Sequence, residues 1–176
     1  MSRKFLKTSN CKPINLLFSG MDLSYDGMYK VSTIKTMSCP CRSGKQYEAC
    51  CQIFHQGKNP DTALQLMRSR FAAYALCLPD YIIHTTHPAN PQFFHDTAEW
   101  TRKISEFSSH TEFKDLEILG FQESNISATV TFVAHLLQDQ KDVSFAEKSY
   151  FEKVKGRWLY RSGQCVPLPK NKDTFA

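Results

Sequence analysis

Four of the seven cysteines in this 176-residue chain lie within thirteen residues, from Cys39 to Cys51. They form two close pairs, Cys39 with Cys41 and Cys50 with Cys51, and eight residues separate the pairs. This spacing is typical of four thiolates around one tetrahedral ion, and zinc accepts four such soft ligands without a geometric demand of its own. A shell of four protein ligands leaves no position for a substrate. The sequence therefore predicts one structural Zn²⁺ ion.

Two other roles remain open for these cysteines. A disulfide knot requires an oxidising compartment, and a linkage between the neighbours Cys50 and Cys51 strains the peptide that joins them. A redox couple of Cys39 and Cys41 leaves the second pair without a role. Zinc binding is favoured because it accounts for all four thiols.

The stretch Cys-Pro-Cys-Arg-Ser-Gly-Lys-Gln-Tyr-Glu-Ala-Cys-Cys resembles the SEC-C motif. This short zinc-binding element occurs at the carboxyl end of the SecA translocation ATPase and in many otherwise unrelated bacterial proteins. The match includes Ser43, Gly44, Lys45 and Tyr47, while Arg42 stands where glycine is more usual. The resemblance implies a docking module with a protein partner, at the ribosome or in the secretion machinery.

Composition and charge narrow the class of protein. Apolar residues make up 41% of the chain, but no run approaches the length of about 18 residues that spans a bilayer. No apolar segment of signal-peptide type follows the first charges, so we expect a cytoplasmic protein with reduced thiols. Of the net charge of +5, residues 1–36 contribute six basic against two acidic residues, and the remainder sixteen against fifteen. Without a concentrated basic face, nucleic acid is not an expected partner.

The chain divides into four predicted segments. Residues 1–36 have scattered charges and no sustained periodicity, which predicts a disordered or loosely attached leader. Residues 37–58 form the zinc element and residues 59–165 an α+β domain. A tail of residues 166–176 follows.

Helical periodicity fills the first half of the α+β domain. A long amphipathic helix is predicted to begin with Asn59 as its cap and Pro60 at its first position, and to end before Pro79. A short helix over residues 80–86 and a third helix over residues 96–107 follow. We expect these helices to pack on one face of a sheet.

The periodicity then changes from helical to alternating. Strands are predicted over residues 113–121, 125–138, 143–154 and 157–163, the last two joined by a tight Lys-Gly hairpin. Helices followed by an antiparallel meander indicate an α+β fold, with the helices on one side of a curved sheet.

Four further segments are similar to the middle domain of the YchJ family of bacterial proteins: Arg-Ser-Arg-Phe-Ala-Ala-Tyr, Asp-Tyr-Ile-Ile-His-Thr-Thr-His-Pro, Glu-Lys-Ser-Tyr-Phe and Arg-Trp-Leu-Tyr-Arg-Ser-Gly. The resemblance implies a cone-shaped fold like nuclear transport factor two, which encloses a pocket. YchJ proteins often carry a second SEC-C motif at their end. Here only Cys165 is present, followed by Val-Pro-Leu-Pro-Lys, so no second zinc site is expected. An exposed sheet in this fold class often pairs with a copy of itself, which predicts a homodimer.

The pocket residues most suited to chemistry are Glu147, His84 and His87. Alternation along the strand places Glu147 on one face with Phe145 and Ser149, where a carboxylate can act as a general base. The two histidines are three residues apart, so on a helix they share a face and can act as acid or base.

Each of these residues also has a structural role open to it, which we favour. Glu147 can neutralise a buried arginine, Arg68 or Arg70, although the simplest account of both arginines is a solvated helix face. The His-Pro pair at His87 can end a helix. Three aromatic residues, Trp100, Trp158 and Tyr160, suit an apolar wall or a core.

Two functions follow from the sequence. The first, which we favour, is a non-catalytic adaptor that uses the zinc element to dock on a protein. The second is a small-molecule-binding protein or an enzyme of the isomerase, dehydratase or hydrolase type, using Glu147 with His84 or His87. A cavity on which ionisable groups converge favours the second, and a cavity filled by aromatic side chains favours the first.

Overall fold

The structure, a computed structural model, describes residues 37–169. The predicted leader and most of the predicted tail lie outside the described residues. The helices are α1 (Gln52–His55), α2 (Ala63–Ala75), α3 (Pro79–His84) and α4 (Thr97–Ser109). The strands are β1 (Glu112–Glu123), β2 (Ser127–Gln138), β3 (Lys141–Asp142), β4 (Phe145–Val154) and β5 (Arg157–Val166).

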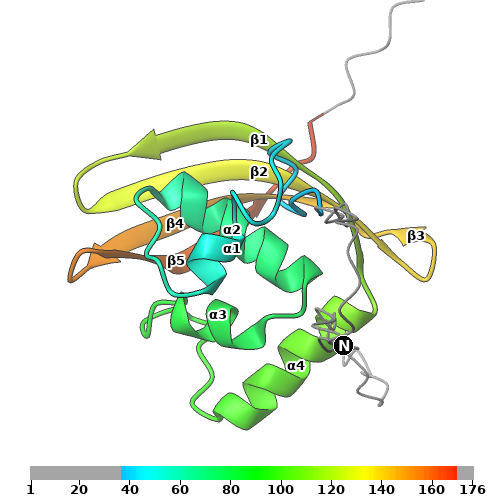
Figure 1. Ribbon diagram of the computed structural model, residues 1–176, viewed down its shortest axis with the longest axis horizontal. Coiled ribbons are helices and arrows are strands. Elements are labelled where there is room, and N and C mark those ends of the chain that lie inside the picture. The colour runs from blue at the N-terminus through cyan, green and yellow to red at the C-terminus, as the bar shows by residue number, and fades with distance from the viewer. Residues whose placement is uncertain (1–36, 170–176) are drawn as a thin grey trace, which may run out of the picture.

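The strands form one antiparallel sheet in the order β1-β2-β4-β5, and the short β3 pairs with the end of β2. Two register shifts interrupt β1, between Phe113 and Asp115 and between Ile118 and Gly120. Such irregularities bend a strand, and Figure 1 shows the curved sheet with the helices gathered on one side of it. The predicted α+β architecture is confirmed.

Helix α2 begins three residues later than the sequence indicates. Its cap is Thr62, whose hydroxyl accepts a hydrogen bond from the backbone of Gln65 at 3.2 Å. The Gln65 side chain in return accepts from the backbone N–H of Thr62 at 3.3 Å, which completes a capping box. The prediction of Asn59 as the cap is therefore wrong, because the reciprocal bonds of Thr62 and Gln65 satisfy the first amides of the helix.

The hairpin between β4 and β5 turns at Lys155 and Gly156, as predicted. Both residues have positive φ, 49° and 80°, which suits the two-residue turn that matches the twist of the flanking strands. The register set by the pairing of Val154 with Arg157 holds as far as Phe151 and Tyr160, where a register shift between Tyr150 and Phe151 interrupts it.

Two apolar clusters hold the domain together. In the larger cluster, α2 packs on the sheet through Leu66, Met67 and Phe71. In the second cluster, α3 packs on α4 through Ile82 and Ile104. No helix within residues 37–169 is long and apolar enough to cross a membrane. Pairing of two sheets in a homodimer stays a prediction.

Candidate functional site

Residues 38–51 form a short loop that we call the knuckle. The Cys39 N–H donates to the Lys45 carbonyl at 2.8 Å, and Ser38 pairs with Gln46 in an antiparallel bridge. The chain reverses direction between these two paired segments, and the reversal requires left-handed backbone at Gly44, where φ is +77°. A turn then leads directly into α1, which begins after Cys51, so the second cysteine pair lies at the start of a helix rather than after one.

The knuckle brings the four predicted cysteine ligands together. All four Sγ atoms lie within 4.8 Å of one another. The Cys41 and Cys50 sulfurs are 3.6 Å apart, and those of Cys50 and Cys51 are 3.9 Å apart. Four sulfurs at about 2.3 Å from a tetrahedral ion are separated by about 3.8 Å, so this donor set fits a metal ion of that size.

Hydrogen bonding among the sulfurs separates their affinities for protons. It raises the pKa of Cys39 to about 12, raises the pKa of Cys51 and lowers the pKa of Cys41. Burial adds to the increase for Cys39 and Cys51. Cys39 and Cys51 therefore keep their protons unless a cation replaces them, and metal binding would release those protons.

The knuckle packs on one face of α2. Cys39, Cys41 and Cys51 are buried together with Ala72 of that helix. The Arg68 guanidinium donates to the Cys41 carbonyl at 2.9 Å. Arg68 therefore lies against the knuckle, and its interpretation as part of a solvated helix face is wrong.

His55 at the end of α1 ties the knuckle to α2. Its Nε2–H donates to the Ser69 carbonyl at 2.9 Å, which leaves Nδ1 to accept from the Tyr47 hydroxyl at 2.7 Å. Its ring also contacts the edge of Tyr81, with centroids 4.6 Å apart. Burial lowers the pKa of His55, so the imidazole stays neutral and both hydrogen bonds persist at neutral pH.

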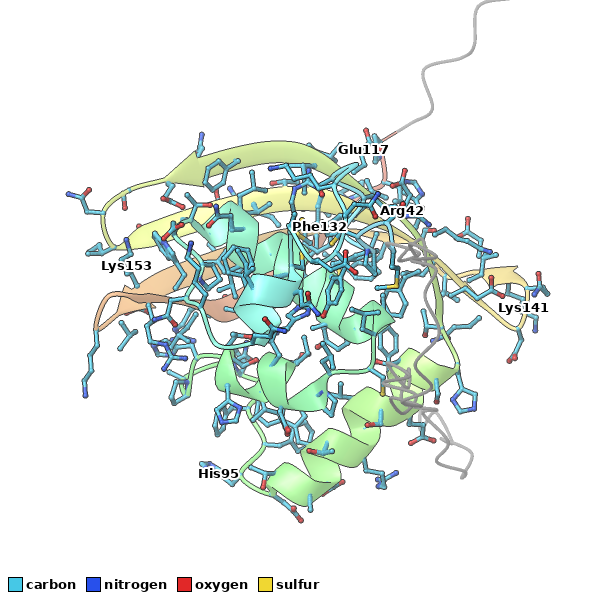
Figure 2. All side chains as sticks on the ribbon, viewed as in Figure 1. Arg42, His95, Glu117, Phe132, Lys141 and Lys153 are labelled. Atoms are coloured by element: carbon cyan, nitrogen blue, oxygen red, sulfur yellow. The ribbon has the colours of Figure 1, made fainter. Side chains whose placement is uncertain are left out.

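A cavity of about 370 Å³ lies on the other side of α2, between that helix, α4 and the sheet. Phe132 of β2, labelled in Figure 2, is one of its aromatic residues and lies between the sheet and the helices. Other aromatic lining residues include Phe71, Trp100, Phe107, Phe145 and Phe151. The polar lining includes Arg70, Glu147 and Tyr160. Ionisable groups and aromatic side chains thus share one cavity.

Glu147 is held inside this cavity by two hydroxyl groups. Ser149 and Tyr160 both donate to its Oε1, the latter at 3.1 Å. Gly163 on β5 makes the room, because a Cβ added there would collide with the Glu147 carboxyl group and the Tyr160 hydroxyl. Burial raises the pKa of Tyr160, and the adjacent Glu147 charge raises it further, so Tyr160 remains a proton donor.

The two predicted pocket histidines lie elsewhere. His84 is exposed, with Nδ1 bonded to the Asp80 carbonyl at 2.7 Å. The His87 backbone bonds to Tyr160 of β5, and its Nε2 lies 3.7 Å from Glu152. Neither histidine lines the cavity: His84 is the exposed last residue of α3, and His87 lies in the segment that joins β5 at Thr86.

Of the three aromatic residues predicted for an apolar wall, Trp100 and Tyr160 line the cavity. Trp158 is instead fully buried in the core and donates to the Asp61 carbonyl at 3.2 Å. Alternation along β5 places Trp158 and Tyr160 on the same face. They differ in position along the strand, because Trp158 lies nearer the start of α2, where that helix covers the sheet.

Arg70 is the cavity residue that sequence analysis missed as a functional group. Only 7% of it is exposed, so the prediction of a solvated face is wrong here too. Its Nη1 donates to the Ile82 carbonyl at 2.9 Å and to the Thr85 and Thr86 hydroxyls at 2.6 and 3.2 Å. The one available signal was its position between Met67 and Phe71, on the apolar side of the helix.

Comparison with known proteins agrees with this geometry. Residues 62–163 match the family described as YchJ, middle NTF2-like domain. A UPF0225 protein of Actinobacillus succinogenes is 37% identical over 140 residues, which cover 78% of this chain and 87% of that protein. A UPF0225 protein of Haemophilus influenzae (strain PittEE) is 35% identical over 147 residues, which cover 82% and 88% of the respective chains.

Two solved structures share the fold. The solution structure of a SEC-C motif containing protein from Rhodopseudomonas palustris has a TM-score of 0.64 and 35% identity, covering 74% of this chain and all of that one. The crystal structure of a SEC-C motif containing protein from Psychrobacter arcticus has a TM-score of 0.61 and 27% identity, covering 79% and 87%. With the four-cysteine knuckle, the NTF2-like cone and these relatives, the chain belongs to the YchJ family.

Proposed function

We propose that Cys39, Cys41, Cys50 and Cys51 hold one structural Zn²⁺ ion. The separations between the sulfur atoms suit a tetrahedral shell. Thiolate ligands favour zinc, because few other biological cations bind to them. The Ser43 hydroxyl lies 3.2 Å from the Cys50 sulfur and would donate to it once the thiol is ionised. Because the shell contains four protein ligands, the ion would stabilise the knuckle and take no part in catalysis.

The zinc proposal is tested by elemental mass spectrometry of the purified full-length chain. We expect about one zinc per chain, and loss of that zinc in Cys50→Ser. The matched control is Cys165→Ser, since Cys165 is exposed and lies outside the cluster. Free thiols and no zinc in the unmodified chain would contradict the proposal and return the cysteines to a redox role.

We propose further that the NTF2-like domain binds a small organic molecule in its cavity. The observation that carries this proposal is the convergence of Arg70 and Glu147 on an aromatic cavity of about 370 Å³. Ligand sites in proteins have this size and this mixture of apolar walls with a few placed polar groups. The geometry favours binding over the predicted acid–base chemistry, because neither His84 nor His87 accompanies Glu147 in the cavity.

Ligand binding is tested by nuclear magnetic resonance with a library of small organic fragments. We expect fragments to shift the amide signals of cavity residues such as Phe132, and Ala134→Leu, which fills the cavity, to abolish these shifts. Ala98→Leu on the exposed start of α4 is the control. If no fragment shifts the cavity signals, the proposal is wrong.

A third proposal concerns the exposed side of the knuckle, which would dock on a protein partner. The cysteines face α2, whereas Arg42 and Lys45 are exposed (Figure 2 labels Arg42). This basic surface suits an acidic partner such as the ribosome or a component of the secretion machinery. The double variant Arg42→Ala/Lys45→Ala is expected to lose co-sedimentation with ribosomes, while Lys155→Ala at the distant hairpin retains it. Equal behaviour of both variants would exclude this surface.

A further inference from the structure

Arg70 carries a buried positive charge that forms no direct ion pair with a described carboxylate, and Tyr160 lies between it and Glu147. None of the ion pairs among residues 37–169 includes it. Its Nη1 is committed to neutral acceptors on α3 and just after it, Ile82, Thr85 and Thr86. Charged side chains this deeply buried are ordinarily paired, because an uncompensated charge away from water is costly.

The remaining edge of this guanidinium is available to a ligand. Nε and Nη2 donate to no residue that the structure describes, and Arg70 lines the cavity. The group is fixed in place, since its other edge is hydrogen-bonded and its carbon lies 4.8 Å from the centroid of the Tyr160 ring. Two parallel N–H groups on a fixed plane match the two oxygens of a carboxylate.

Glu147 supplies a negatively charged group in the same cavity, opposite in sign to Arg70. Tyr160 separates the two groups, because Arg70 lies over its ring and Glu147 accepts from its hydroxyl. The two described hydrogen bonds of Glu147 both end on Oε1, so Oε2 remains available as an acceptor. A ligand that reaches Glu147 therefore needs a hydrogen-bond donor.

The other charged groups near the cavity do not pair with Arg70 either. Lys103 also lines the cavity but is a cation; it pairs with Glu99 at 3.0 Å and lies 3.9 Å from the centre of the Phe94 ring. This Glu99 is exposed on the outer side of α4 and forms no ion pair with Arg70. Beyond the charged groups, the walls are mostly aromatic and aliphatic.

We propose that the cavity binds a small organic carboxylate with an aromatic or branched apolar body and a hydroxyl or amino group beside the carboxylate. The carboxylate pairs with Nε and Nη2 of Arg70, and the adjacent donor binds Oε2 of Glu147. The apolar body lies among Phe71, Phe132 and Phe151. Apolar 2-hydroxy and 2-amino acids have this chemistry. The inference rests on the proposed ligand-binding function and specifies its ligand class.

Three matched probes test the ligand class by isothermal titration calorimetry on the full chain: 3-phenyllactate, 3-phenylpropanoate and 3-phenylpropan-1-ol. We expect 3-phenyllactate to bind most tightly, and 3-phenylpropanoate to bind at least about tenfold more tightly than the alcohol, because only the acids form the charge-assisted pair. An alcohol that binds as tightly as the acids would overturn the inference. If neutral fragments bind in the cavity but none of the three probes does, the inferred ligand class is wrong and the ligand-binding function stands. If neither the fragments nor the probes bind, both the ligand class and the ligand-binding function are wrong.

Two substitutions separate the contributions of Arg70 and Glu147. Arg70→Met is expected to abolish the preference for acid over alcohol. Glu147→Gln is expected to keep that preference, since it spares Arg70, but to change the ratio of 3-phenyllactate to 3-phenylpropanoate affinity. If Arg70→Met fails to fold, Glu147→Gln still tests the inferred binding mode. Unchanged affinities for all three probes in that variant would exclude a contact between the ligand and Glu147.

Discussion

Three consecutive side chains of α2 serve three different neighbours. Arg68 donates to the knuckle, Ser69 bonds to Tyr81 at 2.7 Å, and Arg70 enters the cavity. A helix rotates each successive residue by about 100°, so neighbours in sequence point in widely different directions. Substitutions at these adjacent positions should therefore remove different direct contacts: those with the knuckle at Arg68, with Tyr81 at Ser69 and with the cavity at Arg70.

Gly163→Ala is expected to destabilise the protein by about 1–3 kcal/mol, the cost of inserting a methyl group into a filled site. The new Cβ would displace the Glu147 carboxylate from Tyr160. Urea unfolding measures the change. Gly120→Ala is the control, because no atom lies within 4 Å of its added Cβ, and we expect a change within about 0.5 kcal/mol. Equal effects of the two variants would show that Gly163 is not required for packing.

His55 should make the stability of the protein depend on pH. Burial lowers the pKa of the folded-state imidazole, so the unfolded chain binds a proton that the folded chain refuses. The contribution is complete above the unfolded pKa of about 6.5 and is lost as the pH falls through it. Urea midpoints at pH 7.5 and 5.5 should therefore differ less in His55→Gln than in the unmodified chain. The exposed His84→Gln should retain the full difference; loss of the difference in that variant instead would contradict this assignment.

The sequence was informative about residues whose position depends on local pattern. The cysteine pairs lie close in the chain, and strand alternation alone placed Glu147 beside Phe145 and Ser149 on the cavity face. Arg70 was named only as one of two possible buried arginines, because its burial depends on α3, which packs across α2 and supplies the acceptors. No spacing within α2 reveals a neighbour contributed by another helix.

At the scale of elements, the start of α2 was predicted at the wrong residue. Asn59 and Pro60 are favourable starting residues, but Gln65 bonds back to the amides of Asp61 and Thr62 and fixes the start there. The two-residue turn and the alternating strands were predicted well because both depend on neighbours within the same hairpin. His87 lies outside the cavity because its segment pairs with β5, far along the chain, whereas His84 is the exposed end of α3.

Thr62→Ala should destabilise the protein by about 0.5–2 kcal/mol, since it removes the side-chain acceptor at the first turn of α2. Asn59→Ala should have almost no effect, because Asn59 is exposed and lies outside the capping box. Thermal unfolding of both variants tests the assignment. A larger loss in Asn59→Ala would restore the cap predicted from sequence.

At the scale of the whole molecule, the knuckle and the domain have separate apolar clusters but share a contact surface on α2. Cys50→Ser is therefore expected to release the metal and unfold the knuckle while the helices and sheet remain folded. Because Ala72 and Arg68 lose their contacts with the knuckle, the melting temperature should still fall. Circular dichroism and thermal unfolding measure both effects, with Cys165→Ser as the control. Concerted loss of all secondary structure would show that the two parts form one cooperative unit.

Helix α2 has the knuckle on one face and the cavity on the other, as Arg68 and Arg70 illustrate. A change in the position of this helix caused by one site would be felt at the other. If metal binding changed the affinity of the cavity for its ligand by some factor, ligand binding would have to change the affinity of the knuckle for the metal by the same factor. Ligand affinity would then depend on whether the knuckle holds a metal ion, and the thirteen-residue helix α2 alone could couple the two sites.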